Sequence, residues 1–465
     1  MLHSSPRRPN FVRPIPEAPR LFVGVAAAVI AGIAMSAQAQ TEIKVSSSIF
    51  GDTEFDWGRD GINCPACNFG EGNSRFNWTD QDGNLWVGHV NPTTGAFTPP
   101  AGQNELVDTS AFFWSAFGNG PEWAFSTQDG QVVSQLVYTR YVPGSAPTAN
   151  NAGVAFATPV QGGWAANFFP GAFGPNAKGQ AINTVLPEAS QCNSDPVALA
   201  LYKDLSTPKQ MFWEDLSTAP GTAPVLAPIG NYANGIAERW VPCTHQLLFI
   251  GQAGSNAPGG GNAQIFWYDT DTAVSQQLTT DANNHTDGFM FQAPEFDDSY
   301  VFYTVSGNLS IDVYEQTGVA GNGAPTFTLI NQITSPDPLE PYISSTEPFI
   351  NCTPACQTYI FMTLSSVSHS PSRSTPNGLA VTNLNPAQPM FKILVAAQSM
   401  PLKQRADPEY FISARGPLLY YTRIAALTPT TPYKKEGQFF IDMELGTPSG
   451  PCVGSSAEGG LLPGC

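Results

Sequence analysis

The chain has 465 residues, including 43 glycines and 42 prolines, and only 12% of its residues are charged. This composition excludes coiled coils, helical bundles and long α-helical solenoids, because glycine and proline both interrupt helices. Disorder is excluded as well, since 29 Phe, 14 Tyr and 9 Trp supply ample apolar surface for a core. The composition predicts a large all-β protein with many turns.

Residues 1–39 have the pattern of a signal peptide. Four arginines precede the apolar run 21–35, and Ala37-Gln38-Ala39 supplies the small residues of a cleavage site. This run of 15 residues is shorter than the roughly 20 that a membrane-spanning helix needs. We expect cleavage after Ala39, no later transmembrane segment, and a periplasmic or extracellular mature protein. An uncleaved membrane anchor is the alternative.

The charge balance bears on the partners. The first 39 residues hold four of the 20 Lys and Arg and one of the 37 Asp and Glu. The remainder therefore carries 16 basic and 36 acidic residues, a net charge of −20. This argues against nucleic acid or an anionic membrane surface as a partner, because both are bound by clusters of Lys and Arg. The same charge permits cationic ligands, and its simplest role is to keep the protein soluble.

A phrase recurs along the chain: a glutamate beside an aromatic or apolar residue, a turn, and a strand rich in β-branched and aromatic residues. Two examples are GPEWAFSTQDGQVVSQLVYTR and DPEYFISARGPLLYYTR. Successive copies lie 50 to 68 residues apart, and the first copy is the weakest. The repeat glutamates are Glu54, Glu122, Glu188, Glu238, Glu295, Glu347 and Glu409.

Further strands follow the phrase. A third strand is expected in segments such as NLWVGHV, KQMFWED, QIFWYDTDT, LSIDVYE, GLAVTNL and GQFFIDME, and a fourth in GAFTP, SQQLTTD, PTFTLINQI and PMFKILV. Four antiparallel strands in each unit of this length are typical of a propeller blade. We predict a β-propeller of seven four-stranded blades, with six as the alternative. The segment 42–50 is expected to close the ring as the outer strand of the last blade.

The repeat phrase resembles the WD40-like repeats of TolB-type β-propellers, and the resemblance covers most of the chain after residue 39. The turn usual in that family is degraded here, with STQDG and FDDS as its nearest remnants. No additional N-terminal domain like that of TolB is visible, so the resemblance implies the fold and not the Tol function. The predicted boundaries are a signal peptide at 1–39, a propeller at 40–451 and a C-terminal tail at 452–465.

Eight cysteines in an exported chain predict disulfides. Sequence proximity favours a bridge within a hairpin and one that ties down the tail, and the CPAC segment is more typical of a structural bridge than of a redox site. Cys192 and Cys243 follow their repeat glutamates by four and five residues, which places them in consecutive blades. The expected pairs are Cys64–Cys67, Cys192–Cys243, Cys352–Cys356 and Cys452–Cys465.

Three features are candidates for chemistry. The repeat glutamates, expected at the start of each first strand, would ring one end of the propeller and bind a cation or polar ligand, or else accept hydrogen bonds from neighbouring blades. His285 is expected in a loop entering blade five, where ligands often bind. The insertion 58–75 offers oxygen ligands for Ca²⁺, namely Asp56, Asp60, Asn63, Asn68 and Asn73, although a stapled loop is the favoured interpretation.

No catalytic motif stands in its required context, so catalytic residues are unknown. We therefore expect an exported, monomeric propeller that acts as a scaffold for a carbohydrate or protein partner, with no certain cofactor. The alternative is a lyase or glycosidase acting on polysaccharide, with a metal or a carboxylate site at the mouth of the propeller.

Overall fold

The chain divides into two compact units, Met1–Gln38 and Ala39–Cys465. The computed structural model describes parts of the second unit only. The described residues are 40–47, 53–56, 75–80, 82–98, 105–111, 120–128, 131–145, 151–169, 184–190, 199–204, 210–215, 239–252, 261–352, 355–368, 375–426 and 434–446. The predicted signal peptide and the predicted C-terminal tail both lie outside them.

Seven antiparallel sheets follow one another along the chain, and we number them as blades one to seven. Blade one holds β2 (Thr53–Asp56), β3 (Arg75–Thr79), β4 (Leu85–Val90) and β5 (Phe97–Thr98), with β6 (Glu105–Asp108) on the same edge of β4 as β5. Blade two holds β7 (Glu122–Gln128), β8 (Gln131–Tyr141), β9 (Ala152–Val160) and β10 (Gly163–Phe168). Blade three holds β11 (Thr184–Ala189), β12 (Leu199–Asp204) and β13 (Gln210–Asp215).

The later blades are built in the same order. Blade four holds β14 (Arg239–Trp240), β15 (Gln246–Gln252), β16 (Ala263–Asp269) and β17 (Val274–Gln277). Blade five holds β18 (His285–Ala293), β19 (Ser299–Ser306), β20 (Ser310–Val319) and β21 (Pro325–Thr334), with the 3₁₀ helix η2 (Pro294–Phe296) between β18 and β19. Blade six holds β22 (Tyr342–Cys352), β23 (Cys356–Ser365), β24 (Asn377–Asn383) and β25 (Phe391–Val395). Blade seven holds β26 (Gln398–Ser399), β27 (Leu402–Ser413), β28 (Gly416–Ala426), β29 (Lys434–Asp442) and β1 (Ile43–Ser46).

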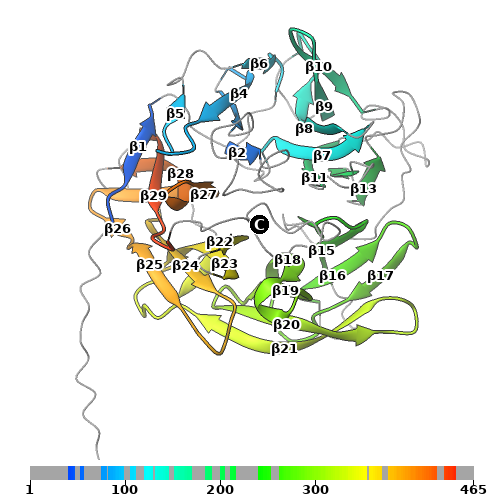
Figure 1. The fold of residues 1–465 in the computed structure, drawn as a ribbon, viewed down its shortest axis with the longest axis vertical. Coiled ribbons are helices and arrows are strands. Elements are labelled where there is room, and N and C mark those ends of the chain that lie inside the picture. Colours follow the sequence, from blue (N-terminus) through cyan, green and yellow to red (C-terminus); the bar gives the residue numbers. More distant parts are fainter. Residues whose placement is uncertain are drawn as a thin grey trace, which may run out of the picture. The chain divides into compact units, whose positions relative to one another are not determined.

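The blades form a closed ring. The strands that open the blades contact one another in the order β2, β7, β11, β14, β18, β22 and β27, and β27 contacts β2 in turn. Figure 1 looks down the axis of the ring and shows β2, β7, β11, β18, β22 and β27 nearest its centre, with later strands of the blades farther out. The predicted seven-bladed β-propeller is therefore confirmed. Within the described residues no helix is long and apolar enough to cross a membrane.

Most of the strands were predictable because their sequences alternate and end in turn residues. Every expected third strand is the third strand of its blade, and the four expected fourth strands are β5, β17, β21 and β25. In blade two the outer pair β9 and β10 was not predicted, since its sequence is rich in small residues such as Ala155, Ala157 and Ala166. Such residues carry a weak strand preference.

Aspartates organise several of the turns. Oδ1 of Asp80 accepts the backbone N–H groups of Asp82 and Asn84, and Oδ2 accepts the Asn84 amide and the Trp86 indole N–H at 2.8 and 2.9 Å. Side-chain acceptance of this kind stabilises the tight turn between β3 and β4. The hydrogen bonds outweigh partial burial and hold the pKa of the Asp80 carboxyl below its usual range.

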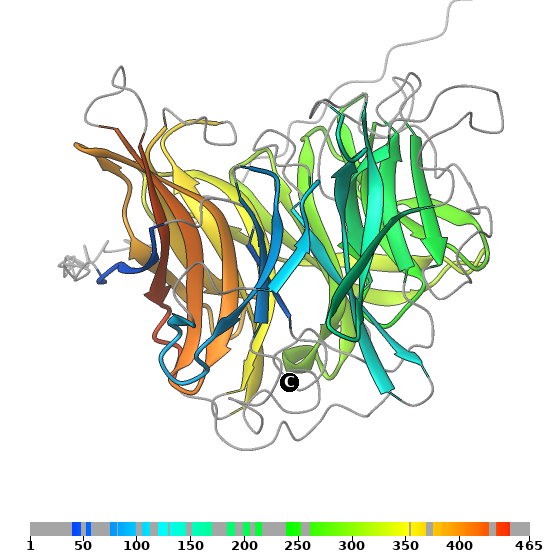
Figure 2. The same ribbon diagram turned by 90° about the horizontal axis from the view of Figure 1, so that it is seen from above.

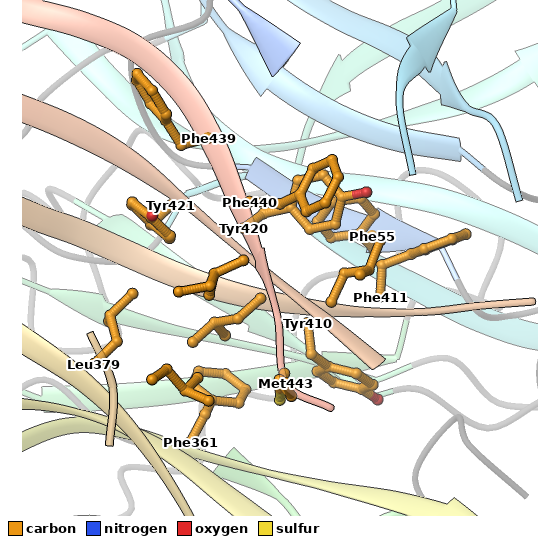
Figure 3. Close-up of a cluster of buried hydrophobic side chains, with 14 of the residues drawn as sticks. Phe55, Phe361, Leu379, Tyr410, Phe411, Tyr420, Tyr421, Phe439, Phe440 and Met443 are labelled. Carbon is orange, nitrogen blue, oxygen red and sulfur yellow. The ribbon is translucent and has the colours of Figure 1, made fainter. Parts of the chain in front are cut away.

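The largest core cluster joins blades six, seven and one. Figure 3 shows its aromatic centre, where Phe55 of blade one lies against Tyr420 and Phe411 of blade seven. The ring centroids of Phe55 and Tyr420 are 4.8 Å apart, and the Tyr420 hydroxyl donates to the carbonyl of Gly95 at 2.5 Å. Each fully buried side chain of this size contributes about 2 kcal/mol or more. Side-chain packing therefore joins the last blade to the first, in addition to their neighbouring positions in the ring.

The N-terminal segment closes the ring, as predicted. β1 pairs antiparallel with β29, opposing Ile43 to Phe440 and Lys44 to Phe439. Figures 1 and 2 show this dark blue strand beside the red and orange strands of blade seven. β1 is thus the outermost strand of the last blade, although the chain then runs on into the first.

Glu42, which directly precedes β1, is held by several groups of blade seven. Its carboxylate lies 2.8 Å from Nε of Arg405 and 3.2 Å from a terminal nitrogen of Arg423, and it accepts the Tyr421 hydroxyl at 2.7 Å. Nζ of Lys403 is 3.7 Å away. Burial alone would raise the pKa of Glu42, but the hydrogen bonds and positive charges outweigh it and lower the pKa to about 2.

The substitution Glu42→Gln is expected to destabilise the propeller in a pH-dependent way. A lowered carboxyl pKa stabilises the fold above the ordinary value near 4.5 and loses that effect as the pH falls toward 2. The loss at pH 7 should be at most about 3 kcal/mol, reduced by solvent screening. Urea unfolding at pH 7 and pH 3 tests this, with the exposed Asp82→Asn as control. An equal loss at both pH values would contradict it.

Candidate functional site

The strands nearest the centre share a break in their pairing. The register with the next strand shifts between Val185 and Glu188 in β11, between Ser344 and Glu347 in β22, and between Ala406 and Glu409 in β27. Such bulges insert extra residues and redirect the side chains that follow. In three blades the residue directly after the bulge is therefore a repeat glutamate.

Blade five has the same bulge with a different residue after it. In β18 the register shifts between Thr286 and Phe289, so Phe289 takes the place that glutamate holds elsewhere. The first bulge residue of this strand is Asp287, with a left-handed φ of 48°, and Ser345 and Asp407 have φ of 49° and 53° in the corresponding places. The repeated backbone strain marks a structural feature shared by blades five, six and seven.

Arg239 of β14 connects the glutamates. One terminal nitrogen of its guanidinium lies 2.7 Å from Glu188 of blade three, and the other lies 3.3 Å from Glu347 of blade six. The same guanidinium sits over the Phe289 ring, 5.1 Å from its centroid. Since Arg239 belongs to blade four, one side chain links four blades across the centre of the ring.

Two more carboxyls belong to this cluster. The Glu409 side chain interacts with Glu347, and this interaction lowers the pKa of the Glu347 carboxyl. Asp287 accepts backbone N–H groups of Thr346 and Ser345. We call Arg239, Glu188, Asp287, Glu347 and Glu409 the central cluster.

Burial raises carboxyl pKa values in the central cluster. Removal from bulk water raises the pKa of Glu347 above its usual range, with Asp287 adding repulsion and Arg239 acting against both. The pKa of Asp287 is raised for the same first reason, and again Arg239 opposes the shift. One cation among four acids leaves the cluster able to hold protons or a cationic group. Within the described residues, no group of three His, Cys, Asp or Glu side chains is placed to hold a metal ion.

The predicted ring of seven glutamates is not uniform. Glu122 is the first residue of β7 and is half-buried. Glu188, Glu347 and Glu409 are the fifth, sixth and eighth residues of their strands rather than the first. The bulges interrupt the sequence pattern of the strand residues that precede them. Glu238 lies outside the described residues, and nothing is assigned to the Glu54 side chain.

Glu295 is a correction to the predicted repeat. It lies in η2, after the first strand of blade five, and its carboxylate accepts the backbone N–H and the hydroxyl of Thr358 at 3.0 Å each. Thr358 belongs to β23, so this glutamate joins blades five and six. The alternative role considered for the repeat glutamates, hydrogen bonding to the neighbouring blade, describes Glu295.

His285 is also placed differently from the prediction. It is not in a loop but is the first residue of β18, and its side chain is fully buried. Its Nε2 lies 3.1 Å from Oδ1 of Asp281, within hydrogen-bond distance. A side chain that solvent does not reach cannot contact a ligand in this conformation, so His285 supports the entry to the strand.

Several predicted residues cannot be compared with the structure. The Ca²⁺ ligands Asp60, Asn63, Asn68 and Asn73 lie outside the described residues, and nothing is assigned to the side chain of Asp56. The same holds for Cys64, Cys67, Cys452 and Cys465. Cys352 and Cys356 form the predicted disulfide across the β22–β23 hairpin, with Cα atoms 3.7 Å apart. Cys243 is disulfide-bonded, and its predicted partner Cys192 is outside the described residues.

The sequence did not reveal Arg239 or Asp287 as central residues. Arg239 stands directly after a repeat glutamate, where the glutamate drew attention, and Asp287 lies two residues after His285. The rarity of basic residues was a usable signal. The chain has nearly twice as many acidic as basic residues, so an arginine at the start of a central strand stands out.

Comparisons with known proteins identify similar folds. No protein-family model and no curated protein sequence matches this chain. Among solved structures, it is similar to a puromycin hydrolase at 12% identity and a TM-score of 0.39, over 76% of this chain and 48% of that one. A putative 6-phosphogluconolactonase from Bacteroides uniformis is 10% identical over 78% of this chain and 94% of that one, with a TM-score of 0.40.

A putative TolB from Agrobacterium tumefaciens is 11% identical over 60% of this chain and 82% of that one, with a TM-score of 0.31. The chain spans about half the length of the puromycin hydrolase structures that it matches. The propeller assignment itself rests on the seven sheets and their closed order of contacts.

Replacing Arg239 by Met is expected to destabilise the protein by about 2 to 3 kcal/mol at pH 7.5, because it leaves Glu188 and Glu347 close together without their cation. The loss should shrink at pH 5, where raised carboxyl pKa values let the cluster protonate. Urea unfolding at both pH values measures this. The exposed Arg415→Met serves as the control, and a loss independent of pH would refute the explanation.

Proposed function

We propose that the chain is an exported β-propeller that works as a binding scaffold for a protein or carbohydrate partner. The observation that carries the proposal is the central cluster, in which Arg239 holds carboxylates of blades three and six to each other. Ion pairs between different blades make the ring of the propeller more rigid. A stiff frame presents its loops in fixed positions, which lowers the entropy lost when a partner binds.

Export is part of the same proposal. The leading 39 residues have the signal-peptide pattern, and the Cys352–Cys356 disulfide suits an oxidising compartment. A net charge of −17 for the chain favours a partner with a neutral or basic surface, because an anionic one would be repelled. Binding of Ca²⁺ by the insertion 58–75 remains part of the proposal.

A second candidate is a glycosidase. Asp287 and Glu347 both have raised carboxyl pKa values and act on each other electrostatically, and a carboxyl kept protonated near neutral pH is what a general acid needs. The two groups belong to neighbouring blades, so a sugar chain bound at the centre would meet both.

One set of measurements separates the two candidates. Purified protein is applied to a glycan array, used to capture proteins from the periplasmic or culture fraction, and assayed for depolymerisation of a polysaccharide panel. The scaffold proposal predicts binding without turnover, both in the natural chain and in the Asp287→Asn and Glu347→Gln variants. Turnover that falls at least about a hundredfold in either variant would establish the glycosidase instead.

Metal analysis of the same preparation tests the Ca²⁺ proposal. A stoichiometric ion removed by a chelator, with a lower melting temperature afterwards, is the expected result. Absence of the ion at millimolar free Ca²⁺ would reject this part and leave the scaffold proposal intact.

A further inference from the structure

The centre of the ring carries an excess of negative charge that solvent reaches. The central cluster has four carboxyl groups and one guanidinium, a net charge of −3 when every carboxyl is ionised. Its carboxyls come from blades three, five, six and seven, so the charge is gathered from four parts of the ring. The side chains of Arg239 and Glu347 remain 21% and 26% exposed. An unbalanced charge of this kind attracts a cation from solution.

A buried tyrosine is a second, independent sign of a ligand. Tyr303 of β19 is 0% exposed, and its hydroxyl makes no full hydrogen bond to a described residue. The charges of Glu347, Asp287 and Arg239 act on this hydroxyl, so it faces the central cluster. Thr346 also interacts with it, but the Thr346 hydroxyl is likewise buried without a full hydrogen bond. Unsatisfied buried hydroxyls are costly, so two at one place indicate a missing partner.

The groups around this hydroxyl match an organic ammonium ion. The Phe289 ring is half-buried, and its centroid lies 5.4 Å from that of Tyr303 and 5.1 Å from the guanidinium of Arg239. It brings apolar surface to the charged groups, where an alkyl chain can pack. Carboxylate and hydroxyl oxygens accept the three N–H groups of an ammonium ion. The combination favours an alkylammonium ion over an inorganic cation, which gains nothing from apolar surface.

We propose that the central cluster is a binding site for an alkylammonium group, carried either by a small amine or by a lysine side chain of another protein. Asp287 and Glu347 supply the counter-charge, and the Tyr303 hydroxyl accepts one N–H group. Because this hydroxyl is closed to solvent in the present conformation, the half-buried Phe289 turns aside when the ligand binds. The site lies at the centre of the ring and not on the loops, so it goes beyond the scaffold function, and either proposal can fail alone.

Calorimetric titration of the full chain with n-butylamine at pH 8, where the amine is protonated, tests the site. The expected result is one saturable site with a dissociation constant on the order of 1 mM, which is within the reach of so small a ligand. Butan-1-ol has the same alkyl chain without the charge and should not bind. Saturable binding of Ca²⁺ in place of n-butylamine, or no saturable binding at all, would overturn the proposal.

Two variants locate the binding in the central cluster. Asp287→Asn removes counter-charge, and asparagine tolerates the left-handed φ of this position, so n-butylamine should bind at least about tenfold more weakly. Tyr303→Phe removes only the hydroxyl and should weaken binding about fivefold. The free variant should be no less stable than the natural chain, because that hydroxyl has no full hydrogen bond to lose.

The matched control is Tyr300→Phe, in the same strand as Tyr303 but packed against a different core cluster. It should bind n-butylamine as the natural chain does. If Tyr303→Phe binds as tightly as this control, the hydroxyl serves another partner, such as an ordered water, and the proposal is wrong.

A last titration identifies the source of the ammonium group. Nα-acetyl-lysinamide carries the same butylammonium chain on a peptide backbone. Binding as tight as that of n-butylamine assigns the site to lysine side chains of proteins, whereas binding of n-butylamine alone assigns it to small amines. If neither compound binds, the proposal fails, whatever the glycan array and the capture experiment show of the scaffold function.

Discussion

Glu42 is the group on which closure of the propeller depends, because it ties the N-terminal strand to the last blade of the ring. A buried carboxylate costs several kcal/mol in lost hydration unless its oxygens are satisfied. Here Arg405, Arg423 and the Tyr421 hydroxyl satisfy them, with Lys403 nearby. A network of this kind adds modest stability but fixes the register of a strand that has only four residues. The aromatic core beneath then packs in one arrangement.

The same chemistry with the opposite charge balance stands at the centre. At the rim, Arg405, Arg423 and Lys403 surround the Glu42 carboxylate, and its pKa falls to about 2, although Arg423 also pairs with Glu436. At the centre, burial raises the pKa values of Glu347 and Asp287, and the single guanidinium of Arg239 opposes the rise without cancelling it. The ion pairs and hydrogen bonds of Glu42 at the rim therefore persist at all but very acidic pH. In the central cluster, carboxyls with raised pKa values take up protons at a higher pH than ordinary carboxyls do.

The sequence predicted the order of the blades well and the position of charged residues poorly. Strands such as β20 and β24 contain β-branched residues and are followed by turn residues, so the third strand was recognisable in six of the seven repeats. The innermost strands carry bulges that break this period, so Glu347 was expected at a strand start, five residues after the true beginning at Tyr342. Glu295 and His285 were misplaced for the same reason. Contacts across the ring, such as Arg239 with Glu347, join residues 108 positions apart, and no local pattern announces them.

The arginines show why the outer surface is left acidic. Arg75 of blade one bonds to Ser134 and lies over Trp123 of blade two, and Arg140 returns from blade two to Asp108. Arg239 and Arg405 also connect blades, so among the described residues these cations are used to join blades. A basic side chain held between blades cannot also meet an external anion, so these arginines do not offset the excess of acidic residues toward solvent.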